Sequence, residues 1–507
     1  PNLQAWLSAG VKHKAFTSQT DVWYSESDAF YLYQAENDSK TYTKEANPFL
    51  PHDITLNGTA VRSPMGIEGT EHISAAQKFY YEPNRNLSVQ VYGSMFFMNS
   101  YDLIQDMTFS QSRDFMAGVK AKYNVKDWFT VNLSIHNDFY DRFKRHERID
   151  ERKKVYKSKI FEPRLTLTST YFSGHSIILG VEHTSDELTS DRFVNRKMTT
   201  RALHETEYFL QDEWTANKHW MLSTGVRTNF SKAFGFMYMP KIAVKYSPDE
   251  HWAIRANYSM GYRAPSIKEL FFNWDHLGMF QIRGSEDLKP EKNHYFSLGA
   301  EYTHNGFFMN VNAYINKFRN KIEGVWHIYD MQYNFEYTNL SSQRLYGIEA
   351  ILKWHFLDHF TLNGTYSYVN VSKQDGIQVN TTSPHAATAS IDYVYNYRLK
   401  TIFSTSLMGE KNFDVQDRVW VEEHHKSYDA YFRCTLPTYA LCNLAVVQTF
   451  YNKVKVTLGV DNIFNYVPHT LGSGITMFNV PATSGAKGYV QVEFLVDDIV
   501  KSLKRKK

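Results

Sequence analysis

Residues 304–316 read HNGFFMNVNAYIN and combine a tight turn with a long alternating segment. Beyond Asn305 and Gly306, apolar side chains occupy every second position, at Phe307, Met309, Val311, Ala313 and Ile315. The positions between them carry mainly amide side chains. Because successive side chains of a strand point to opposite faces, this segment predicts a strand of about ten residues with one apolar and one polar face.

The same alternation recurs along the chain, for example in residues 87–97, 220–230 and 454–461. Short polar turns join several such segments, at residues 82–85, 124–127, 247–250, 304–306, 357–359 and 451–452. The other connections are long, at residues 26–71, 141–159, 191–201, 264–292, 372–384 and 411–427. We count roughly 20 strand candidates, many of which reach the roughly 9–11 residues that a tilted membrane strand needs. Short turns on one rim and long loops on the other are typical of a transmembrane β-barrel.

Composition is compatible with this interpretation. Aromatic residues make up 16% of the chain, yet its mean hydropathy is −0.47. No apolar stretch approaches the roughly 18–20 residues of a spanning helix, which excludes a helical membrane protein but not a barrel, whose strands face lipid at every second position. A soluble all-β binding protein with these aromatic residues in its core stays open as an alternative. The 56 basic and 53 acidic residues are balanced, so nothing indicates a nucleic-acid partner.

Motifs of enzymatic sites are absent from the sequence: it has no Gly-x-Ser-x-Gly, His-Glu-x-x-His, phosphate loop or Gly-x-Gly-x-x-Gly opening a helix. We therefore expect no catalytic residue and no intrinsic cofactor. The two cysteines, Cys434 and Cys442, could form one disulfide or be two inert residues. Histidine is the informative titratable residue, because a neutral imidazole in a loop can bind haem iron or another transition metal.

One pair of motifs resembles a known family. Residues 261–265, Gly-Tyr-Arg-Ala-Pro, precede Lys268-Glu269-Leu270 and then residues 287–291, Asp-Leu-Lys-Pro-Glu. This pair resembles the motifs of TonB-dependent outer-membrane haem receptors. Residues 180–193 resemble a mid-barrel segment of Bacteroidota members of this class, and two further segments resemble TonB-dependent barrels generally, at residues 211–214 and 458–465.

The resemblance implies an all-β fold, a large antiparallel transmembrane β-barrel over residues 1–496, followed by a basic tail at residues 497–507. It implies about 22 strands in the parent protein, one of which could be missing here. An N-terminal plug and the segment that contacts TonB are expected to be absent from this chain. The implied partners are outer-membrane lipid, the TonB–ExbB–ExbD complex through that missing segment, and a surface lipoprotein that delivers ligand.

The resemblance also implies a ligand and a site. Haem receptors with these motifs have a ligand histidine between them, and His276 takes that place, so we predict it as the axial ligand of haem iron. Tyr262, Arg263, Ala264, Pro265, Asp287 and Leu288 are the motif residues. A haem pocket needs flat apolar walls and a cation for the haem propionates. The candidate residues for the walls are Phe272, Trp274, Met279 and Phe280, and the candidates for the cation are Arg283 and Arg263.

The predicted function is therefore import of an iron-bearing ligand, preferably haem, through the barrel. The second motif lacks an Asn-Pro before Asp287-Leu288, which departs from the family pattern. Uptake of a siderophore or cobalamin by the same class of receptor remains an alternative, and so does a surface-binding barrel without transport.

Overall fold

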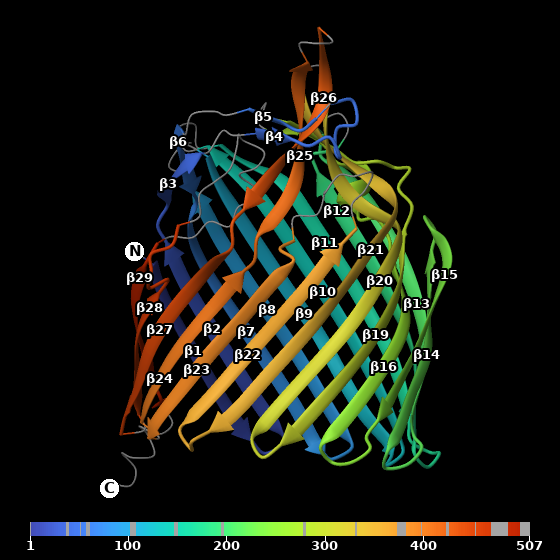
Figure 1. Cartoon of the computed structure of the whole chain (residues 1–507). Helices are drawn as coiled ribbons and strands as arrows, with labels where there is room; N and C mark the ends of the chain where they lie inside the picture. The colour runs from blue at the N-terminus through green and yellow to red at the C-terminus, as the bar shows by residue number, and fades with distance from the viewer. Residues whose placement is uncertain are drawn as a thin grey trace.

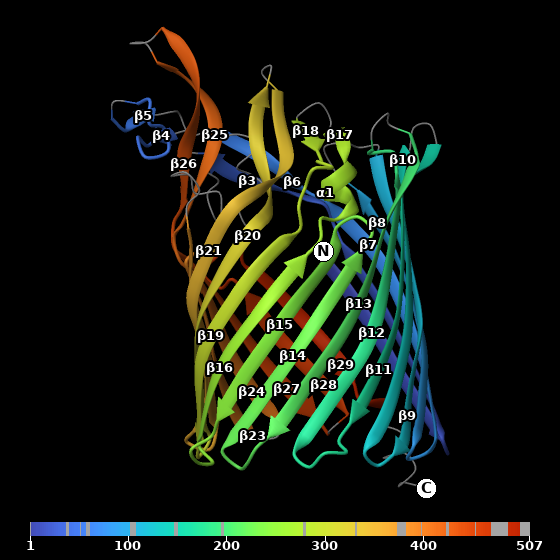
Figure 2. The ribbon, with the colours of Figure 1, turned by 90° about the vertical axis from the view of Figure 1, so that its right-hand side faces the viewer.

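The molecule is a large, twisted, antiparallel sheet that curves into a barrel (Figures 1 and 2). The computed structural model describes residues 2–36, 40–50, 52–56, 61–101, 108–146, 151–193, 197–276, 280–329, 332–372, 382–396, 398–421, 425–451, 453–467 and 485–496. The predicted tail at residues 497–507 lies outside them. No helix in this described part of the chain is long and apolar enough to cross a membrane.

The main sheet has 23 strands, and all of them except β17 and β18 form the barrel wall. The first half of the wall consists of β1 (Asn2–His13), β2 (Phe16–Ser27), β7 (Gly69–Asn84), β8 (Leu87–Tyr101), β9 (Thr108–Lys126), β10 (Phe129–His146), β11 (Glu151–Ser169), β12 (His175–Ser190), β13 (Thr199–Thr215) and β14 (Trp220–Ser231). The second half consists of β15 (Gly235–Tyr246), β16 (Trp252–Arg263), β19 (Glu291–His304), β20 (Phe307–Tyr329), β21 (Gln332–Phe356), β22 (Phe360–Val371), β23 (His385–Asn396), β24 (Leu399–Met408), β27 (Tyr439–Phe450), β28 (Val454–Asp461) and β29 (Lys487–Phe494). Each wall strand pairs antiparallel with the next, which confirms the predicted fold class.

The short turns lie together on one rim, at the bottom of Figure 1. The turn between β19 and β20 shows why they are short, because Asn305 and Gly306 have φ of 44° and 78°. Two adjacent positive φ values are the requirement of the two-residue turn that best fits the twist of a hairpin, and Asn-Gly is the pair that adopts them most readily. The turn predicted at residues 304–306 is therefore confirmed.

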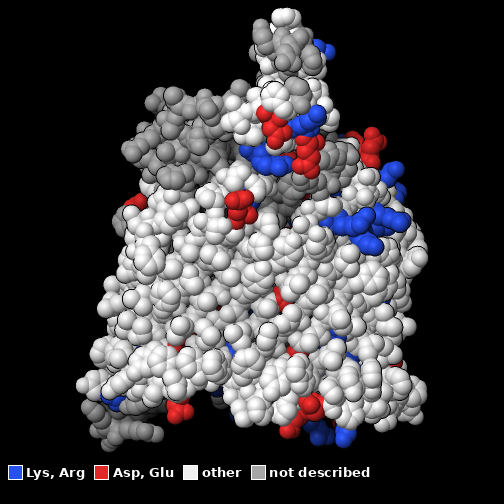
Figure 3. Space-filling view, in the orientation of Figure 1, with Lys and Arg blue, Asp and Glu red and all other residues white. Residues whose placement is uncertain are grey.

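The wall strands are apolar on their outer face. On β19 and β21, outward positions such as Leu298 and Ile348 are 60% and 46% exposed. Such exposure is costly in water but is expected where lipid covers the surface. Figure 3 shows the same property on the face turned to the viewer, as a broad belt with few charged side chains.

Several connections predicted as loops contain strands, so those predictions were wrong in this respect. Residues 141–159 belong almost entirely to β10 and β11, which continue to His146 and from Glu151. Here both faces are polar because the strands have left the apolar belt, and a polar strand has no hydrophobic alternation to reveal it. The connection at residues 26–71 contains β3 (Phe30–Glu36), which pairs with β6 (Val61–Ile67).

A separate four-stranded sheet lies beyond the upper rim, opposite the short turns (Figure 1). It joins β4 (Lys40–Tyr42) and β5 (Ile54–Leu56) to the hairpin of β25 (Lys411–Val421) and β26 (Lys426–Leu436). The pairing between β26 and β4 consists of Phe432 with Tyr42 and Arg433 with Thr41. We call this element the cover sheet.

The cover sheet has its own apolar core and a pair of hydrogen bonds that connects its two parts. Tyr42, Leu50, Phe413, Ala430 and Phe432 are buried together. The Asn47 side chain binds the backbone of Tyr431 twice, accepting from its N–H at 2.6 Å and donating to its C=O at 2.8 Å. These contacts join segments that are far apart in the sequence.

A second insertion lies between β16 and β19. It comprises α1 (Ile267–Phe271), β17 (Asn273–His276) and β18 (Phe280–Arg283), and β18 pairs in parallel with the upper part of β21. Figure 2 shows it at the upper rim of the barrel. We call residues 264–290, with this helix and hairpin, the mouth segment.

Candidate functional site

The mouth segment is fixed to the barrel by Arg263, the last residue of β16. Its guanidinium donates to both carboxylate oxygens of Glu269 at 3.0 and 2.9 Å and to Glu291 at 2.9 Å. The same Glu291 oxygen accepts from the backbone N–H of Ile322 at 2.6 Å. One side chain thereby ties the helix α1 to β19, and through Glu291 to β20.

The helix α1 is short, so its caps matter more than its length. Ser266 accepts from the backbone N–H of Glu269, and the Glu269 carboxylate accepts from the backbone N–H of Ser266 at 2.7 Å, which completes a capping box. Burial would raise the pKa of Glu269, but the hydrogen bonds from Arg263 and Ser266 outweigh it, so its pKa is lowered. The buried Pro265 precedes this cap and favours an extended entry into the helix.

Apolar contacts hold the other faces of the mouth segment. Ile267 and Phe272 are buried against Leu188 and Phe193 of the β12 end of the wall. Leu270 and Leu288 are buried with Ile322 in an adjoining cluster. The aromatic Phe272, predicted as a pocket wall, therefore packs the mouth segment against the barrel.

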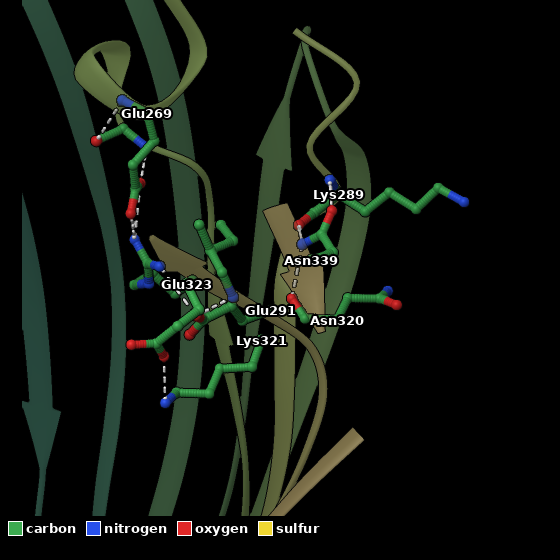
Figure 4. A network of polar contacts seen from close by, with 10 residues as sticks. Glu269, Lys289, Glu291, Asn320, Lys321, Glu323 and Asn339 are labelled. Atoms are coloured by element: carbon green, nitrogen blue, oxygen red, sulfur yellow. Dashed lines mark hydrogen bonds and ion pairs between the residues drawn. The ribbon is translucent and has the colours of Figure 1, made fainter. Parts of the chain in front are cut away.

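A second polar network ties the end of the mouth segment to β20 and β21 (Figure 4). The Asn339 side chain accepts from the backbone N–H of Lys289 and donates to its C=O, both at 2.8 Å. It also donates to the backbone C=O of Asn320 at 2.8 Å, where the chain has a positive φ of 53°. Lys321 forms an ion pair with Glu323 at 2.6 Å close to this network.

The structure places the other predicted site residues as follows. The backbone of His276 pairs with that of Phe280 at the tip of the β17–β18 hairpin. The His276 side chain and Met279 lie outside the described residues, so the predicted iron-binding role remains a prediction. Asp287 is exposed, Tyr262 and Ala264 are half-buried, and Arg283 forms an ion pair with Glu336 at 3.6 Å.

Trp274 lies beneath a cation that the sequence did not single out. The Arg192 guanidinium is 4.1 Å from the centre of its ring, and the backbone C=O of Arg192 accepts from the N–H of Asn273. Burial, followed by the positive charge of Arg142, lowers the pKa of Arg192. Arg142 and the Asp191 carboxylate are therefore both close to Arg192.

Two further cations complete a group that we call the basic cluster: Arg142, Lys144 and Arg192. Phe139 of β10 points outward and is 41% exposed, so the alternate residues Arg142 and Lys144 point into the barrel. Arg142 donates to the Ser110 hydroxyl at 2.8 Å, and the neighbouring Asp191 carboxylate pairs with Lys153 at 3.2 Å. Within the described ranges, none of the three cations forms an ion pair with a carboxylate.

Sequence reasoning missed the basic cluster, although a signal for it existed. Arg142 and Lys144 continue the inward positions of β10, in register with Ser112 and Ser110 of β9. Extending the alternation of residues 129–139 through residue 144 would have placed both cations on the inner face. Only the structure brings Arg192, from the connection after β12, next to them.

In the described part of the chain, no group of three or more His, Cys, Asp or Glu side chains is arranged to hold a metal ion. Cys442 is a buried free thiol whose sulfur lies 3.3 Å from the Thr405 hydroxyl, and the Cys434 side chain is outside the described residues.

Comparison with known proteins identifies what this barrel is similar to. A family model described as TonB dependent receptor-like, beta-barrel matches residues 9–463. The chain is 23% identical over 324 residues to the iron-regulated outer membrane virulence protein of Vibrio cholerae, a match covering 61% of this chain and 47% of that protein. It is 23% identical over 273 residues to the ferric enterobactin receptor of Pseudomonas aeruginosa, covering 48% and 35% of the two chains. The chain thus spans about half the length, or less, of these relatives.

Solved structures confirm the fold. The Pseudomonas aeruginosa ferric enterobactin receptor in complex with enterobactin superposes with a TM-score of 0.71 at 14% identity, over 97% of this chain and 80% of that chain. A copper transporter superposes equally well, with a TM-score of 0.72 at 13% identity, over 97% and 79% of the chains. Proteins with different cargo thus share this barrel, so the choice of ligand must be argued from the mouth.

Proposed function

The chain belongs to the TonB-dependent receptor family, and we propose that it is the barrel of an outer-membrane receptor that imports an anionic iron chelate. The family consists of transport receptors rather than enzymes, and the barrel lies in the outer membrane. The relatives, an iron-regulated outer membrane virulence protein and a receptor for ferric enterobactin, favour an iron-siderophore ligand.

The basic cluster is the observation that carries this proposal. Among the described residues, Arg142, Lys144 and Arg192 form no ion pair, and the nearby Asp191 carboxylate pairs with Lys153 instead. The planar Trp274 lies against Arg192. A ferric catecholate complex is anionic and has flat aromatic rings. It would supply the missing negative charge and stack on guanidinium or indole planes.

In this mechanism, the mouth binds the chelate and the rest of the receptor shifts to a state that lets it pass. Binding shifts that equilibrium only if the ligand has a higher affinity for one of the two states. The energy for transport would come from the TonB–ExbB–ExbD complex, which we propose as the partner of the full-length receptor. A surface lipoprotein that delivers the ligand remains a prediction.

Haem is the second candidate ligand, favoured by His276 at the tip of the hairpin that begins at Asn273. In the sequence His276 stands between the two motifs. An axial histidine would give a specific spectroscopic signature, because it changes the absorbance of the porphyrin.

The test compares two ligands and two sets of variants of the purified receptor. Binding of a ferric tris-catecholate and of haemin is measured for the wild type, for Lys144→Gln/Arg192→Gln and for His276→Ala. We expect the double variant to bind the catecholate with roughly 1–3 kcal/mol less free energy, because two charge-assisted contacts are removed. The control is Lys126→Gln/Lys218→Gln, which removes two exposed cations at the short turns of the opposite rim.

Unchanged catecholate affinity in Lys144→Gln/Arg192→Gln would overturn the proposal. Tight haemin binding that is lost in His276→Ala, with no catecholate binding, would replace the siderophore with haem. In that case the receptor class would stand, while the role of the basic cluster would not.

A further inference from the structure

A second group of cations lies on the outer wall, away from the mouth. Lys317 and Arg319 of β20, Arg344 of β21 and Lys292 of β19 form it, and we call it the outer basic patch. The register places Lys317 opposite Arg344 and Arg319 opposite Lys292. Lys317, Arg319 and Arg344 are exposed, and Lys292 is half-buried.

Strand alternation shows that these cations point away from the lumen. On β20 they follow the outward positions Phe307, Met309, Val311, Ala313 and Ile315. On β21 Arg344 follows Ile348 and Tyr346, which are 46% and 47% exposed on the outer face. Because side chains two positions apart share a face, Lys317 and Arg344 extend these apolar rows directly.

The change from apolar to basic occurs where the membrane should end. From the short turn, the apolar row of β20 covers residues 307–315 and that of β21 covers residues 354–346. Both lengths match the roughly 9–11 residues that a tilted strand needs to cross the hydrocarbon. The next outward residues, Lys317 and Arg344, are cross-strand partners and thus lie at similar heights, on the side opposite the short turns. That height is the headgroup level of the outer leaflet.

No carboxylate in the described part of the chain forms an ion pair with the outer basic patch. Its four cations form no ion pair in the ranges that the structure describes, whereas other wall cations do, such as Lys455 with Glu493 at 2.6 Å and Arg255 with Glu301 at 3.0 Å. Four adjacent cations without a counter-charge repel one another unless an anion lies between them. In Figure 3, basic side chains gather at one side of the molecule above the uncharged belt.

We propose that the outer basic patch binds the phosphate groups of an anionic lipid in the outer leaflet. Arginine and lysine are the usual phosphate ligands, and basic residues at the headgroup level bind anionic lipids. The apolar row below the patch, ending in Ile315, Tyr346 and Ile348, provides the surface for the acyl chains. A free phosphate ion would use the cations but would not explain their alignment above this apolar row.

The experiment measures lipid retention by the purified, detergent-solubilised receptor. Native mass spectrometry records binding of diphosphorylated lipid A to the wild type and to Lys317→Gln/Arg319→Gln/Arg344→Gln. We expect the variant to bind at least roughly tenfold more weakly, because three headgroup contacts are lost. The control, Arg85→Gln/Lys126→Gln/Lys218→Gln, removes three exposed cations at the short turns and should bind lipid A like the wild type.

Further controls distinguish binding of lipid from binding of a free anion, and the loss of charge from a loss of fold. Lys317→Arg/Arg344→Lys keeps both charges and should retain the lipid, and an unchanged circular dichroism spectrum of the Gln variant would show that its barrel is intact. Inorganic phosphate should not displace lipid A at equal concentration. Undiminished lipid A binding by the folded Gln variant, equal loss in the control, or displacement by phosphate alone would each overturn the proposal.

Discussion

The mouth contains two groups of cations that differ in how their charge is balanced. Arg263, which belongs to the motif shared with the family, donates to Glu269 and Glu291 and is neutralised by both. Arg142, Lys144 and Arg192, which belong to no motif, form no ion pair among the described residues, and the nearby Asp191 carboxylate pairs with Lys153. The motif residue Arg263 therefore holds the mouth segment in place, and we call its contacts and those of Asn339 the frame of the mouth. The cations available to a ligand are those of the basic cluster, which lies beside this frame.

The largest effect is expected from removing the frame. Arg263→Ala leaves two mostly buried carboxylates, Glu269 and Glu291, without their cation, and should destabilise the mouth segment locally by roughly 2–3 kcal/mol. Hydrogen exchange of residues 267–283 measures this as faster exchange of α1 and of the β17–β18 hairpin. Arg263→Lys, which keeps the charge but not the fork of hydrogen bonds, should lie between the alanine variant and the wild type.

Protection of α1 that is unchanged in Arg263→Ala would show that the apolar contacts of Ile267 and Leu270 suffice to hold the frame. Arg263 would then not be needed to hold the mouth segment, and its contrast with the ligand-binding basic cluster would be wrong.

A smaller effect is expected at the other end of the frame. Asn339→Ala removes three hydrogen bonds to the backbone of Lys289 and Asn320, in a half-exposed setting where each contributes about 0.5–1 kcal/mol. We expect faster hydrogen exchange near residues 288–291 and little change in α1. Asn339→Asp, which can still accept from the Lys289 N–H but cannot donate, is the matched control. Equal exchange in Asn339→Ala and the wild type would contradict the structural role of this side chain.

The smallest effect is expected from a change of pH on the stability of α1. The lowered pKa of Glu269 in the folded mouth means that its ionised form stabilises α1. This stabilisation is fully present above the ordinary carboxyl value of about 4.3 and is lost as pH falls below it, through the lowered folded value. Exchange of α1, corrected for its intrinsic pH dependence, should therefore accelerate at acid pH, and less so in Glu269→Gln. The same acceleration in both proteins would remove Glu269 as its cause.

The sequence was sufficient to predict those elements that depend on neighbouring residues alone. The alternation of residues 307–316 and the pair Asn305-Gly306 predict a strand and its turn, since each depends only on neighbouring residues. The family motif likewise identified Arg263. Its partner Glu291 lies 28 residues away and gave no local signal for the ion pair.

The rest depends on contacts between distant segments. β26 pairs with β4 across most of the length of the chain, and neither strand alone shows which partner it will take. The upper parts of β10 and β11 carry polar side chains on both faces, so no alternation of apolar and polar residues marks them as strands in the sequence. For this reason Arg142 and Lys144 were assigned to a loop, and their convergence with Arg192 was missed.

The cover sheet connects two stretches of chain that leave the wall at different places, one between β2 and β7 and the other between β24 and β27. Among the described residues, two register pairs, Tyr42 with Phe432 and Thr41 with Arg433, and the side chain of Asn47 connect the backbones of the two stretches. In mechanical terms the cover sheet is a connection between these two stretches. The connection has fewer backbone pairs than the long ladder between β25 and β26, and is therefore weaker. A force that widens the mouth would therefore act on the contacts of Asn47 and Tyr42 before it acts on the ladder between β25 and β26.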